Sequence, residues 1–335
     1  EISIEGGSMK ELQKKKLLSD QRFVAFLVAM ALVVIYMIFS PGFRHYSSFV
    51  SMMDFSYYDI LMAIGVTFPL ITAGVDLSIG TGMVCYALVA GTLIRNYDLP
   101  VGIAMLICIV MGVLMGLING ILVGVMNLAP FIATLSTCMI TRGIGSMCKA
   151  TPWPTVTQPG GWFHSIFKLT FGSGRSALRL PIGLVIMIAL VILMEFVLNH
   201  TRMGRYTIAI GSNKEATALS GVNVRFYHVM SYVICGLFTG LAAIAYAAVT
   251  PTVQPGTGAG LEMDAIGGVF VGGVCATGGY GSIIGTFIGV MVIMLLKTGL
   301  PYVGLQSNWQ QIITGAVLIV AVLIDIKRNK GKKDE

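Results

Sequence analysis

Charged side chains are scarce in this sequence. Only 11% of its 335 residues are Asp, Glu, Lys or Arg, 56% are hydrophobic, and the mean hydropathy is +0.84. A soluble domain carries roughly 25% charged residues, so this chain cannot cover a surface that faces water. The composition excludes an ordinary soluble protein and predicts an all-α polytopic protein embedded in a lipid bilayer.

Motifs for nucleotide binding and for common catalytic sites are also missing. The sequence contains no G-x-x-x-x-G-K-[ST] phosphate loop, so the chain cannot hold ATP in that manner. No two of its four histidines have H-x-x-x-H spacing, and no pair of carboxylates lies in a polar motif. We therefore expect a protein that is not an enzyme and that holds no metal or cofactor of its own.

Cysteine pairs with metal-type spacing are absent too. The six cysteines lie mostly within apolar segments, so we interpret them as small buried hydrophobic residues and not as a disulfide framework. They are Cys85, Cys108, Cys138, Cys148, Cys235 and Cys275.

Basic residues exceed acidic ones and give a formal net charge of +7. Such a charge could indicate nucleic-acid binding, but its distribution argues against that function. Fourteen of the 22 lysines and arginines fall in residues 10–22, 202–225 and 327–333, all next to apolar segments. This clustering follows the positive-inside rule, so we expect all three segments, and both termini, in the cytoplasm.

Ten apolar segments are long enough to consider as membrane helices. About 20 residues cross a bilayer, so segment 265–276 is too short and the glycine-rich segment 77–94 is borderline. The count is therefore eight to ten, and it must be even because both termini lie inside. Ten crossings also place loop 149–180 outside and loop 199–225 inside, so ten is our prediction. The segments are 23–40, 58–74, 77–94, 100–125, 130–148, 181–198, 226–249, 265–276, 282–299 and 309–326.

The first eight residues look unlike a natural start, whereas Met9-Lys10 is a plausible one. We expect residues 1–8 to be an added leader and residues 9–335 to form a single transmembrane domain that ends in the basic tail 327–335. Segment 23–40 would then be an uncleaved first helix.

The two halves of the chain share a weak pattern. Residues 74–80 (GVDLSIG) have a possible counterpart in residues 262–268 (EMDAIGG), and residues 116–131 resemble residues 285–302. The spacing between these stretches differs in the two halves. We predict two inverted repeats of about five helices each, because short, Gly-interrupted segments at corresponding places mark a midplane site in transporters.

Charges inside apolar segments are costly and therefore informative. Asp76 precedes a glycine-rich segment, where it is either an N-cap or, with Ser78, part of a polar path. Asp264, beside Glu262, has the same two interpretations. We expect Arg142 to be a structural brace that meets a carboxylate or carbonyl groups within the membrane.

Two further charges, Glu195 and Lys297, lie near the ends of their apolar segments. We expect both side chains to snorkel toward the membrane surface.

A short polar stretch, residues 212–221, separates two long apolar segments. Ser212 and Glu215 have the spacing of a capping box, and Gly221 is placed to end the helix in a left-handed turn. The predicted helix, 213–220, is too short to be stable alone. Its apolar positions Ala216, Leu219 and Val222 would form the packing face.

These motifs together resemble a known family. The stretch Glu215-Ala216-x4-Gly221 resembles the E-A-A-x-x-x-G coupling loop of ABC importer permeases, with Thr217 in place of the second Ala. Nearly the whole chain, about 25–328, resembles the ribose/galactose-type sugar permeases. The similar stretches are 201–206 (TRMGRY), 219–223 (LSGVN), 74–80, 131–135 (FIATL) with Arg142-Gly143, and 262–266 (EMDAI).

The resemblance implies a subunit of a bacterial inner-membrane importer. Two permeases, as a homodimer or a close heterodimer, would sit on two ATPase subunits that carry ATP and Mg, and a periplasmic binding protein would deliver the solute. Branched-chain amino acid or nucleoside permeases, and more remotely an ATP-independent secondary transporter, are the alternatives.

The candidate site residues fall into three groups. For ATPase coupling they are Ser212, Asn213, Lys214, Glu215, Ala216, Leu219 and Gly221. For the substrate pathway they are Asp76, Ser78, Phe131, Thr134 and Asp264. Arg142, Gly80 and Gly268 are assigned structural roles.

Overall fold

The computed structural model describes residues 21–171, 178–250 and 252–331. The predicted leader 1–8, the basic residues of 10–16 and the end of the basic tail, 332–335, lie outside the described residues.

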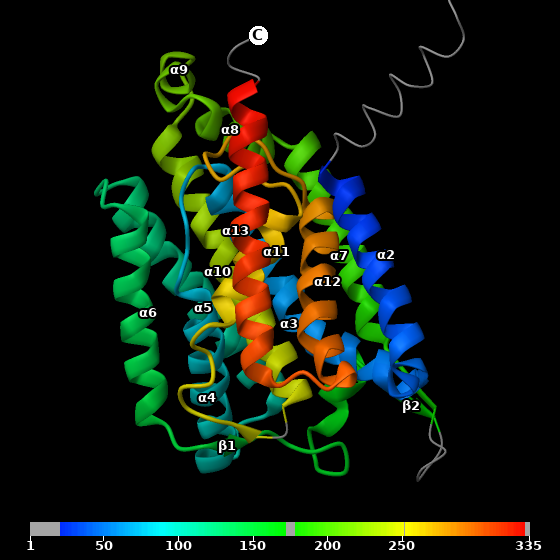
Figure 1. Cartoon of the computed structure of the whole chain (residues 1–335). Helices are drawn as coiled ribbons and strands as arrows, with labels where there is room; N and C mark the ends of the chain where they lie inside the picture. The colour runs from blue at the N-terminus through cyan, green and yellow to red at the C-terminus, as the bar shows by residue number, and fades with distance from the viewer. Residues whose placement is uncertain (1–20, 172–177, 251, 332–335) are drawn as a thin grey trace, which may run out of the picture.

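Helices dominate the described chain, and each apolar segment predicted from the sequence overlaps one of them (Figure 1). The largest difference is at the second segment, where the helix begins at Tyr46 and not near residue 58. The long helices are α2 (Gln21–Phe39), α3 (Tyr46–Ile71), α4 (Ile79–Tyr97), α5 (Val101–Gly124), α6 (Pro130–Met147), α7 (Ile182–His200), α10 (Val224–Val249), α12 (Ile283–Gly299) and α13 (Ser307–Gly331). The shorter ones are α8 (Arg202–Ser212), α9 (Lys214–Leu219), α11 (Leu261–Val271), and the 3₁₀ turns η1 (Pro41–Arg44), η2 (Gly161–Ile166) and η4 (Leu300–Val303).

Six helical segments of the described chain are long and apolar enough to cross a membrane. They are α2, α3, α5, α7, α10 and the joined α12–η4 segment, Ile283–Val303. The chain is therefore a mostly helical membrane protein. In contrast, α11 has 11 residues and is about 16 Å long, roughly half of a bilayer core of about 30 Å.

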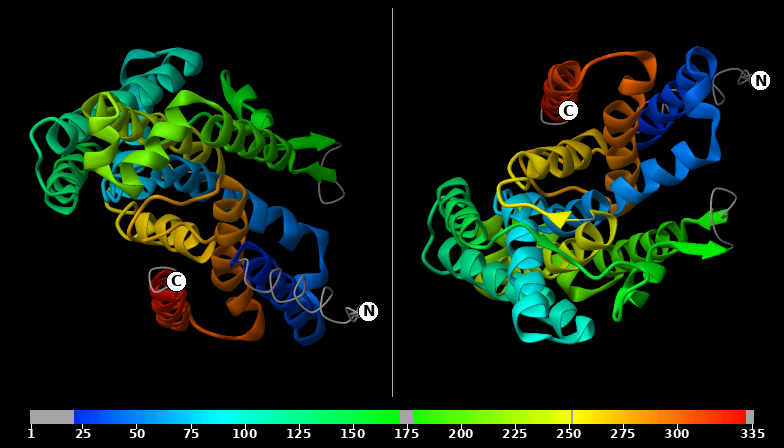
Figure 2. Two further views of the ribbon diagram at one scale, coloured as in Figure 1. Left: turned by 90° about the horizontal axis from the view of Figure 1, so that it is seen from above. Right: turned by 90° about the horizontal axis from the view of Figure 1, so that it is seen from below.

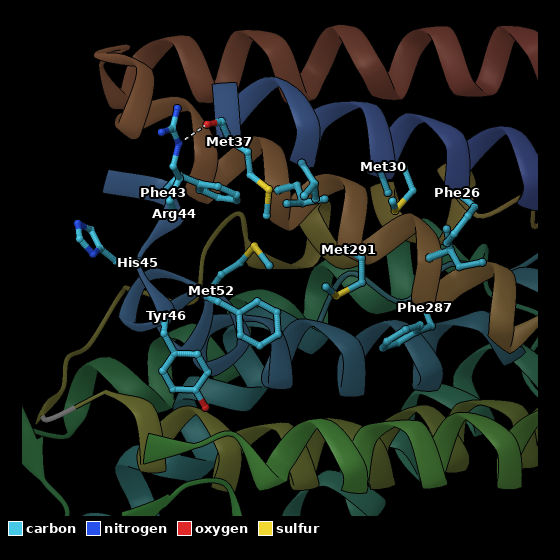
Figure 3. A pocket seen from close by; sticks show the side chains of 15 residues that line it. Phe26, Met30, Met37, Phe43, Arg44, His45, Tyr46, Met52, Phe287 and Met291 are labelled. Atoms are coloured by element: carbon cyan, nitrogen blue, oxygen red, sulfur yellow. Dashed lines mark hydrogen bonds between the residues drawn. The ribbon is translucent and has the colours of Figure 1, made fainter. Parts of the chain in front are cut away.

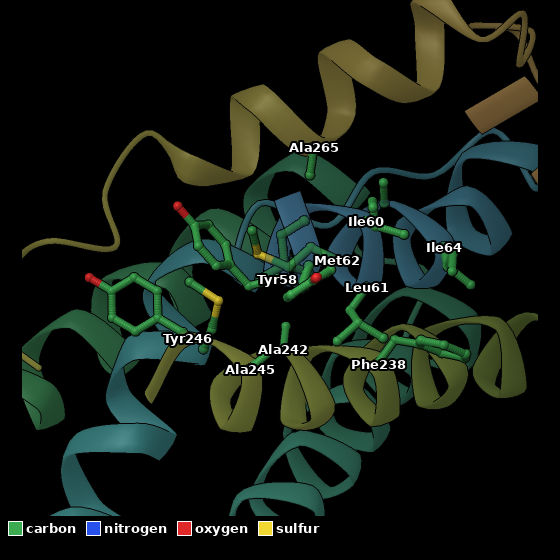
Figure 4. Close-up of a cluster of buried hydrophobic side chains, with 14 of the residues drawn as sticks. Tyr58, Ile60, Leu61, Met62, Ile64, Phe238, Ala242, Ala245, Tyr246 and Ala265 are labelled. Carbon is green, nitrogen blue, oxygen red and sulfur yellow. The ribbon is translucent and has the colours of Figure 1, made fainter. Parts of the chain in front are cut away.

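Helices α3 and α10 form the centre of the bundle (Figures 2 and 4). Helix α3 packs on α10, α12 and α11, and α10 packs on α5, α3 and α4. Within the most apolar stretch, 83% of α3 is buried but only 11% of α2. The rings of Tyr58 and Tyr246 meet edge to face at 5.3 Å, so aromatic packing joins the two central helices. Peripheral helices such as α2 therefore expose their apolar side chains to lipid.

Small residues bring α5 and α10 together. A Cβ atom on Gly112 would collide with the backbone of Gly236 and Gly240, and one on Gly116 would collide with the carbonyl oxygen of Tyr232. Membrane helices associate closely where small residues recur at i, i+4 spacing, because their backbones then touch. The glycines of 112–116 and 236–240 thus fix the position of α5 against the centre.

The chain is mainly helical, as the predicted all-α fold class requires, but its described part also contains four short strands. The described chain contains β1 (Thr151–Pro152), β2 (Leu169–Phe171), β3 (Leu178–Leu180) and β4 (Thr252–Val253), which pair β1 with β4 and β2 with β3, both antiparallel. They are too short to show a period-2 pattern in the sequence. They lie at the end of the bundle opposite α9 (Figure 1).

Two side chains hold the 149–180 loop against this end of the bundle. The indole of Trp153 donates to the carbonyl oxygen of Ala87 at 3.0 Å. The imidazole of His164 lies 2.9 Å from the carbonyl oxygens of both Ala248 and Pro154. These bonds hold residues 153–164 of the loop over α4 and the end of α10.

Candidate functional site

Helix α9 stands at one end of the molecule, beyond the long helices (Figure 1). Asn213 has an extended backbone, and its side-chain oxygen accepts the Ala216 N–H at 2.9 Å. Gly221, with φ +79°, then ends the turn in a left-handed conformation that only glycine adopts without strain. The predicted helix stop is confirmed, and the helix itself covers only six residues.

The predicted capping box is wrong. Ser212 is the last residue of α8, and its hydroxyl donates to the carbonyl oxygens of Ile208, at 3.0 Å, and Gly279, at 3.4 Å. Asn213 takes the cap position instead, because Asn and Ser are equally good N-caps and the backbone becomes extended one residue later than expected. Glu215 is therefore not the reciprocal member of a box, although it remains in the first turn of α9.

The exposed face of α9 differs from the predicted one. Thr217 is the buried residue of this helix, whereas Leu219 is 90% exposed and Glu215 and Ala216 are exposed as well. A Cβ atom added to Gly221 would meet nothing within 4 Å. No described residue covers the Leu219 side chain, so α9 presents an apolar residue, together with the carboxylate of Glu215, on its outward surface.

Helix α8 connects α9 to the interior of the bundle. A Cβ atom on Gly211, near the end of α8, would collide with the carbonyl oxygen of Ile71, the last residue of α3. The N–H of Gly279 donates to that same oxygen at 2.8 Å. Three segments thus meet under α9: the end of α8, the turn that leads into α4 and the loop that leads into α12.

Helices α4 and α11 begin inside the bundle, and their first turns touch. A Cβ atom on Gly80 would lie 2.6 Å from the carbonyl oxygen of Gly258, and one on Gly258 would lie 2.5 Å from the carbonyl oxygen of Gly80. The carboxylate of Glu262 accepts the Gly260 N–H at 3.0 and 3.1 Å. We call the contact of residues 79–82 with residues 256–262 the half-helix junction.

Asp76 lies beside the junction in a closed polar network. Its carboxylate accepts the Ser78 N–H at 2.9 Å, the Ser78 hydroxyl at 2.6 Å and the side-chain amide of Asn119 at 3.2 Å. Thr137 then donates to the amide oxygen of Asn119 at 2.8 Å. Asp76 and Ser78 are 2% and 4% exposed, so the network binds α4, α5 and α6 together and lines no open surface. Asn119 could not be predicted from the sequence, because a single amide in an apolar segment gives no pattern.

Helix α6 divides the remaining candidates between two faces. Thr134, Thr137 and Thr141 form a buried stripe, in which Thr141 bonds Thr81 of α4 at 2.8 Å. Phe131 lies on the outer face and is 57% exposed. Arg142 is also exposed, and its guanidinium has no hydrogen-bond or ion-pair partner among the residues that the structure describes. The expected partner for Arg142 is therefore not found in the described part of the chain.

Asp264 forms an ion pair with Lys297, which corrects the prediction that Lys297 snorkels. A second carboxylate, Asp59 of α3, is fully buried, and neither of its oxygens has a hydrogen-bond partner. Lys297 interacts electrostatically with both carboxylates. The single ammonium group of Lys297, on α12, thus interacts with carboxylates on both α11 and α3. Asp264 is held by an ion pair between α11 and α12, and Gly260, not Asp264, takes the N-cap position of α11.

Glu195 does not snorkel either. Its carboxylate accepts the backbone N–H groups of Ile283, at 2.6 Å, and Ile284, at 3.2 Å, together with the Ser282 hydroxyl. An anion at a helix N-terminus is favourable, because it satisfies free N–H groups and complements the dipole. Glu195 therefore ties α7 to the start of α12.

Gly268 lies where α11 crosses α12. A Cβ atom there would approach the backbone of Val290 at 2.8 Å, so a side chain would separate the two helices. Close packing also leaves little space near the half-helix junction, where a cavity of about 10 Å³ is lined by Thr81, Arg142 and Gly258 among others. A cavity of that size holds about one water molecule.

A helical membrane bundle with two helices that start in its interior, and with a short exposed helix at one end, has the architecture of a membrane transport protein. A sequence model of the family described as branched-chain amino acid transport system / permease component matches residues 48–322. The chain belongs to this family.

Curated relatives match over nearly their full length. The ribose import permease protein RbsC of Bacillus subtilis is 36% identical over 92% of this chain and 94% of its own, and RbsC of Escherichia coli is 32% identical over 94% and 96%. The galactose/methyl galactoside import permease protein MglC of Escherichia coli is 33% identical over 97% and 100%. No solved structure matches the chain. The protein is thus the permease component of an import system and not an enzyme.

Proposed function

We propose that this permease carries a monosaccharide across the bacterial inner membrane as part of an ABC importer. The observation that supports this proposal is the full-length similarity to permeases named for ribose and galactose import. A further relative, 34% identical, is named a probable ABC transporter permease. A solute-binding protein would deliver the sugar, and a separate ATPase subunit would hold ATP and Mg.

Helix α9 is the proposed contact with the ATPase. It is short and held by an N-cap and a terminal glycine, and its Leu219 is left 90% exposed by the described residues. An apolar residue rimmed by polar side chains marks a protein contact. When the ATPase dimer closes, it would move α9, and α8 would pass this motion to the loops before α4 and α12.

The proposed topology has ten helices that cross or enter the membrane, both termini in the cytoplasm, and two inverted repeats. Helices α3 and α10 have 26 residues each, and each is followed by an irregular segment and then a helix that starts inside the bundle. In both halves that helix packs on the two that come after it: α4 on α5 and α6, and α11 on α12 and α13. This correspondence supports α3–α6 and α10–α13 as the repeated units.

The proposed pathway runs along the axis between two copies of the permease. Residues 254–260 have an irregular backbone and lead from β4 into the bundle, and Gln254, Ala259 and Gly260 are exposed. Irregular backbone at membrane depth requires protein or water around it, not lipid. The exposed guanidinium of Arg142 lies at the same small cavity. The buried groups Asp76, Ser78 and Thr134, and the partly buried Asp264, would then hold the moving elements beside this path, and Phe131 would face outward.

Thiol labelling tests this pathway. We expect Gln254→Cys and Ala259→Cys to react with a charged, membrane-impermeant thiol reagent in vesicles, because both positions would face water. Ile192→Cys, on α7, is the control: the isoleucine is 62% exposed but faces lipid, so it should stay unmodified. Equal protection of all three positions would contradict a path along residues 254–260.

Uptake by the reconstituted importer, with its own binding protein and ATPase, tests the substrate class. We expect ribose or galactose to be transported, and leucine or a nucleoside to be neither transported nor inhibitory. The family description favours branched-chain amino acids as the second candidate. Transport of leucine with no transport of any pentose or hexose would replace the sugar proposal with that candidate.

A further inference from the structure

An apolar groove of about 590 Å³ runs along the outer side of the bundle, between α2, the start of α3 and α12 (Figure 3). Its volume lies in the range of ligand sites, roughly 300–1,000 Å³. Phe26, Met30, Val33 and Met37 form one wall at i, i+4, i+7 and i+11. This spacing places all four on one face of α2. The opposite wall comes from α3 and α12, and includes Met52, Phe287 and Met291.

The length of the groove matches one leaflet of a bilayer. Phe26 and Met37 are 11 residues apart on a helix, so the wall extends roughly 16 Å. Half of a hydrocarbon core of about 30 Å is about 15 Å. Four methionines line the groove, and flexible thioether side chains adapt to a flexible occupant. Because the walls are apolar, water would not fill the space stably.

The polar residues of the groove gather at one end. Arg44, His45 and Tyr46 follow one another there, at the end of α2 away from α9 (Figure 3). The guanidinium of Arg44 donates from Nε to the carbonyl oxygen of Met37 at 2.6 Å and from Nη2 to that of Ile38 at 3.2 Å. These bonds fix the side chain at the end of α2. Its Nη1 group has no protein acceptor among the described residues, and no carboxylate lines the groove.

We propose that this groove binds an anionic phospholipid in the leaflet opposite α9. One acyl chain lies between α2 and α12, and the phosphate accepts hydrogen bonds from Arg44. A guanidinium matches a phosphate well, because its parallel N–H groups bond two oxygens at once. The combination of an apolar wall one leaflet long with an uncompensated positive charge at its end fits this amphiphile and no water-soluble ligand.

Native mass spectrometry of the full chain, released from nanodiscs of stated composition, tests the proposal. Dioleoyl phosphatidylglycerol, in equal mixture with dioleoyl phosphatidylcholine, is expected to be retained about tenfold more. Both lipids offer a phosphate, but the trimethylammonium group of phosphatidylcholine repels the guanidinium of Arg44, whereas phosphatidylglycerol keeps a net negative charge. Arg44→Ala should reduce its retention to the level of phosphatidylcholine. Arg44→Lys keeps the charge and should retain an intermediate amount.

Two control variants separate the groove from general effects. Arg95 is exposed in the last turn of α4, at the same end of the molecule, so Arg95→Ala should leave lipid retention unchanged. Met30→Trp should fill the groove and reduce retention of both lipids with Arg44 intact. Free phosphate should displace no lipid. Equal retention of the two lipids by the wild type, or undiminished retention by Arg44→Ala, would overturn the proposal.

Discussion

Glu215→Lys combined with Gly221→Asp is expected to abolish solute uptake while the permease still reaches the membrane. Glu215 lies on α9 and Gly221 in the turn that follows it, and both are exposed. A Cβ atom on Gly221 would meet no described atom within 4 Å. Lysine in the first turn opposes the helix dipole, and Asp at φ +79° strains the terminal turn by about 1–2 kcal/mol. The ATPase would then meet a reversed charge on a helix of altered shape. Uptake in vesicles, and ATP hydrolysis stimulated by the solute, both measure the effect.

Gly304→Asp is the matched control for this variant. Gly304 ends the η4 turn with φ +84°, and its added Cβ atom would also meet nothing within 4 Å. The substitution carries the same strain at the opposite end of the molecule, so uptake should remain near the wild-type rate. Normal transport by the Glu215→Lys, Gly221→Asp variant would contradict a role of α9 in coupling.

Lys297→Met is expected to produce the largest loss of stability among single substitutions. It would leave Asp264 without its ion-pair partner and Asp59 without the nearby ammonium group, both among apolar helices. The Lys297 and Asp264 side chains are 31% and 13% exposed, so the loss of their ion pair should cost on the order of 1–3 kcal/mol, and the fully buried Asp59 should add to that cost. The free energy of unfolding in mixed micelles should fall accordingly.

A double-mutant cycle checks the cause. Lys297→Met with Asp264→Asn should be more stable than Lys297→Met alone, with a coupling energy of about 0.5–3 kcal/mol. Lys168→Met breaks the ion pair between the outer loop and Asp54 of α3, a pair that is about as exposed as the Lys297–Asp264 pair. A larger loss for Lys297→Met than for Lys168→Met would therefore measure the added effect of Asp59. Additive effects of the two substitutions at 297 and 264 would show that the pair contributes nothing to the bundle.

The helices of this protein could be predicted from hydropathy, because a long apolar run that lies in a membrane must satisfy its backbone hydrogen bonds internally, as a helix does. The helix α8 was missed, since residues 202–212 mix polar and apolar positions and gave only a loop. The cap of α9 was placed one residue early, because Ser212 and Asn213 are chemically equivalent caps. Only the extended backbone at Asn213 distinguishes them.

Contacts between distant residues account for the other differences. Glu195 caps a helix 87 residues further along the chain, and Lys297 pairs with an acid 33 residues before it. A charged side chain near the end of an apolar segment can either snorkel to the membrane surface or pair with a group on another helix. The spacing in the sequence does not identify that partner. The role of Asp59 could not be predicted either, because its neighbour Lys297 lies far away in the sequence. The arrangement of such groups follows from the packing of whole helices.

At the half-helix junction, a structural glycine was predicted, but its contact partner was not predicted. Gly80 was assigned a structural role from its resemblance to a family motif, and the structure places it against Gly258. The sequence did not reveal that the starts of α4 and α11 touch each other. That contact requires both irregular segments, 72–78 and 254–260, to turn into the bundle.

The reactivity of a cysteine at position 219 tests most directly whether α9 is the contact with the ATPase. Leu219 is 90% exposed in the isolated chain, so Leu219→Cys should react readily with a thiol reagent in the permease alone. In the complex with the ATPase subunit, this cysteine should be protected. Equal reaction rates in the free permease and in the complex would contradict it.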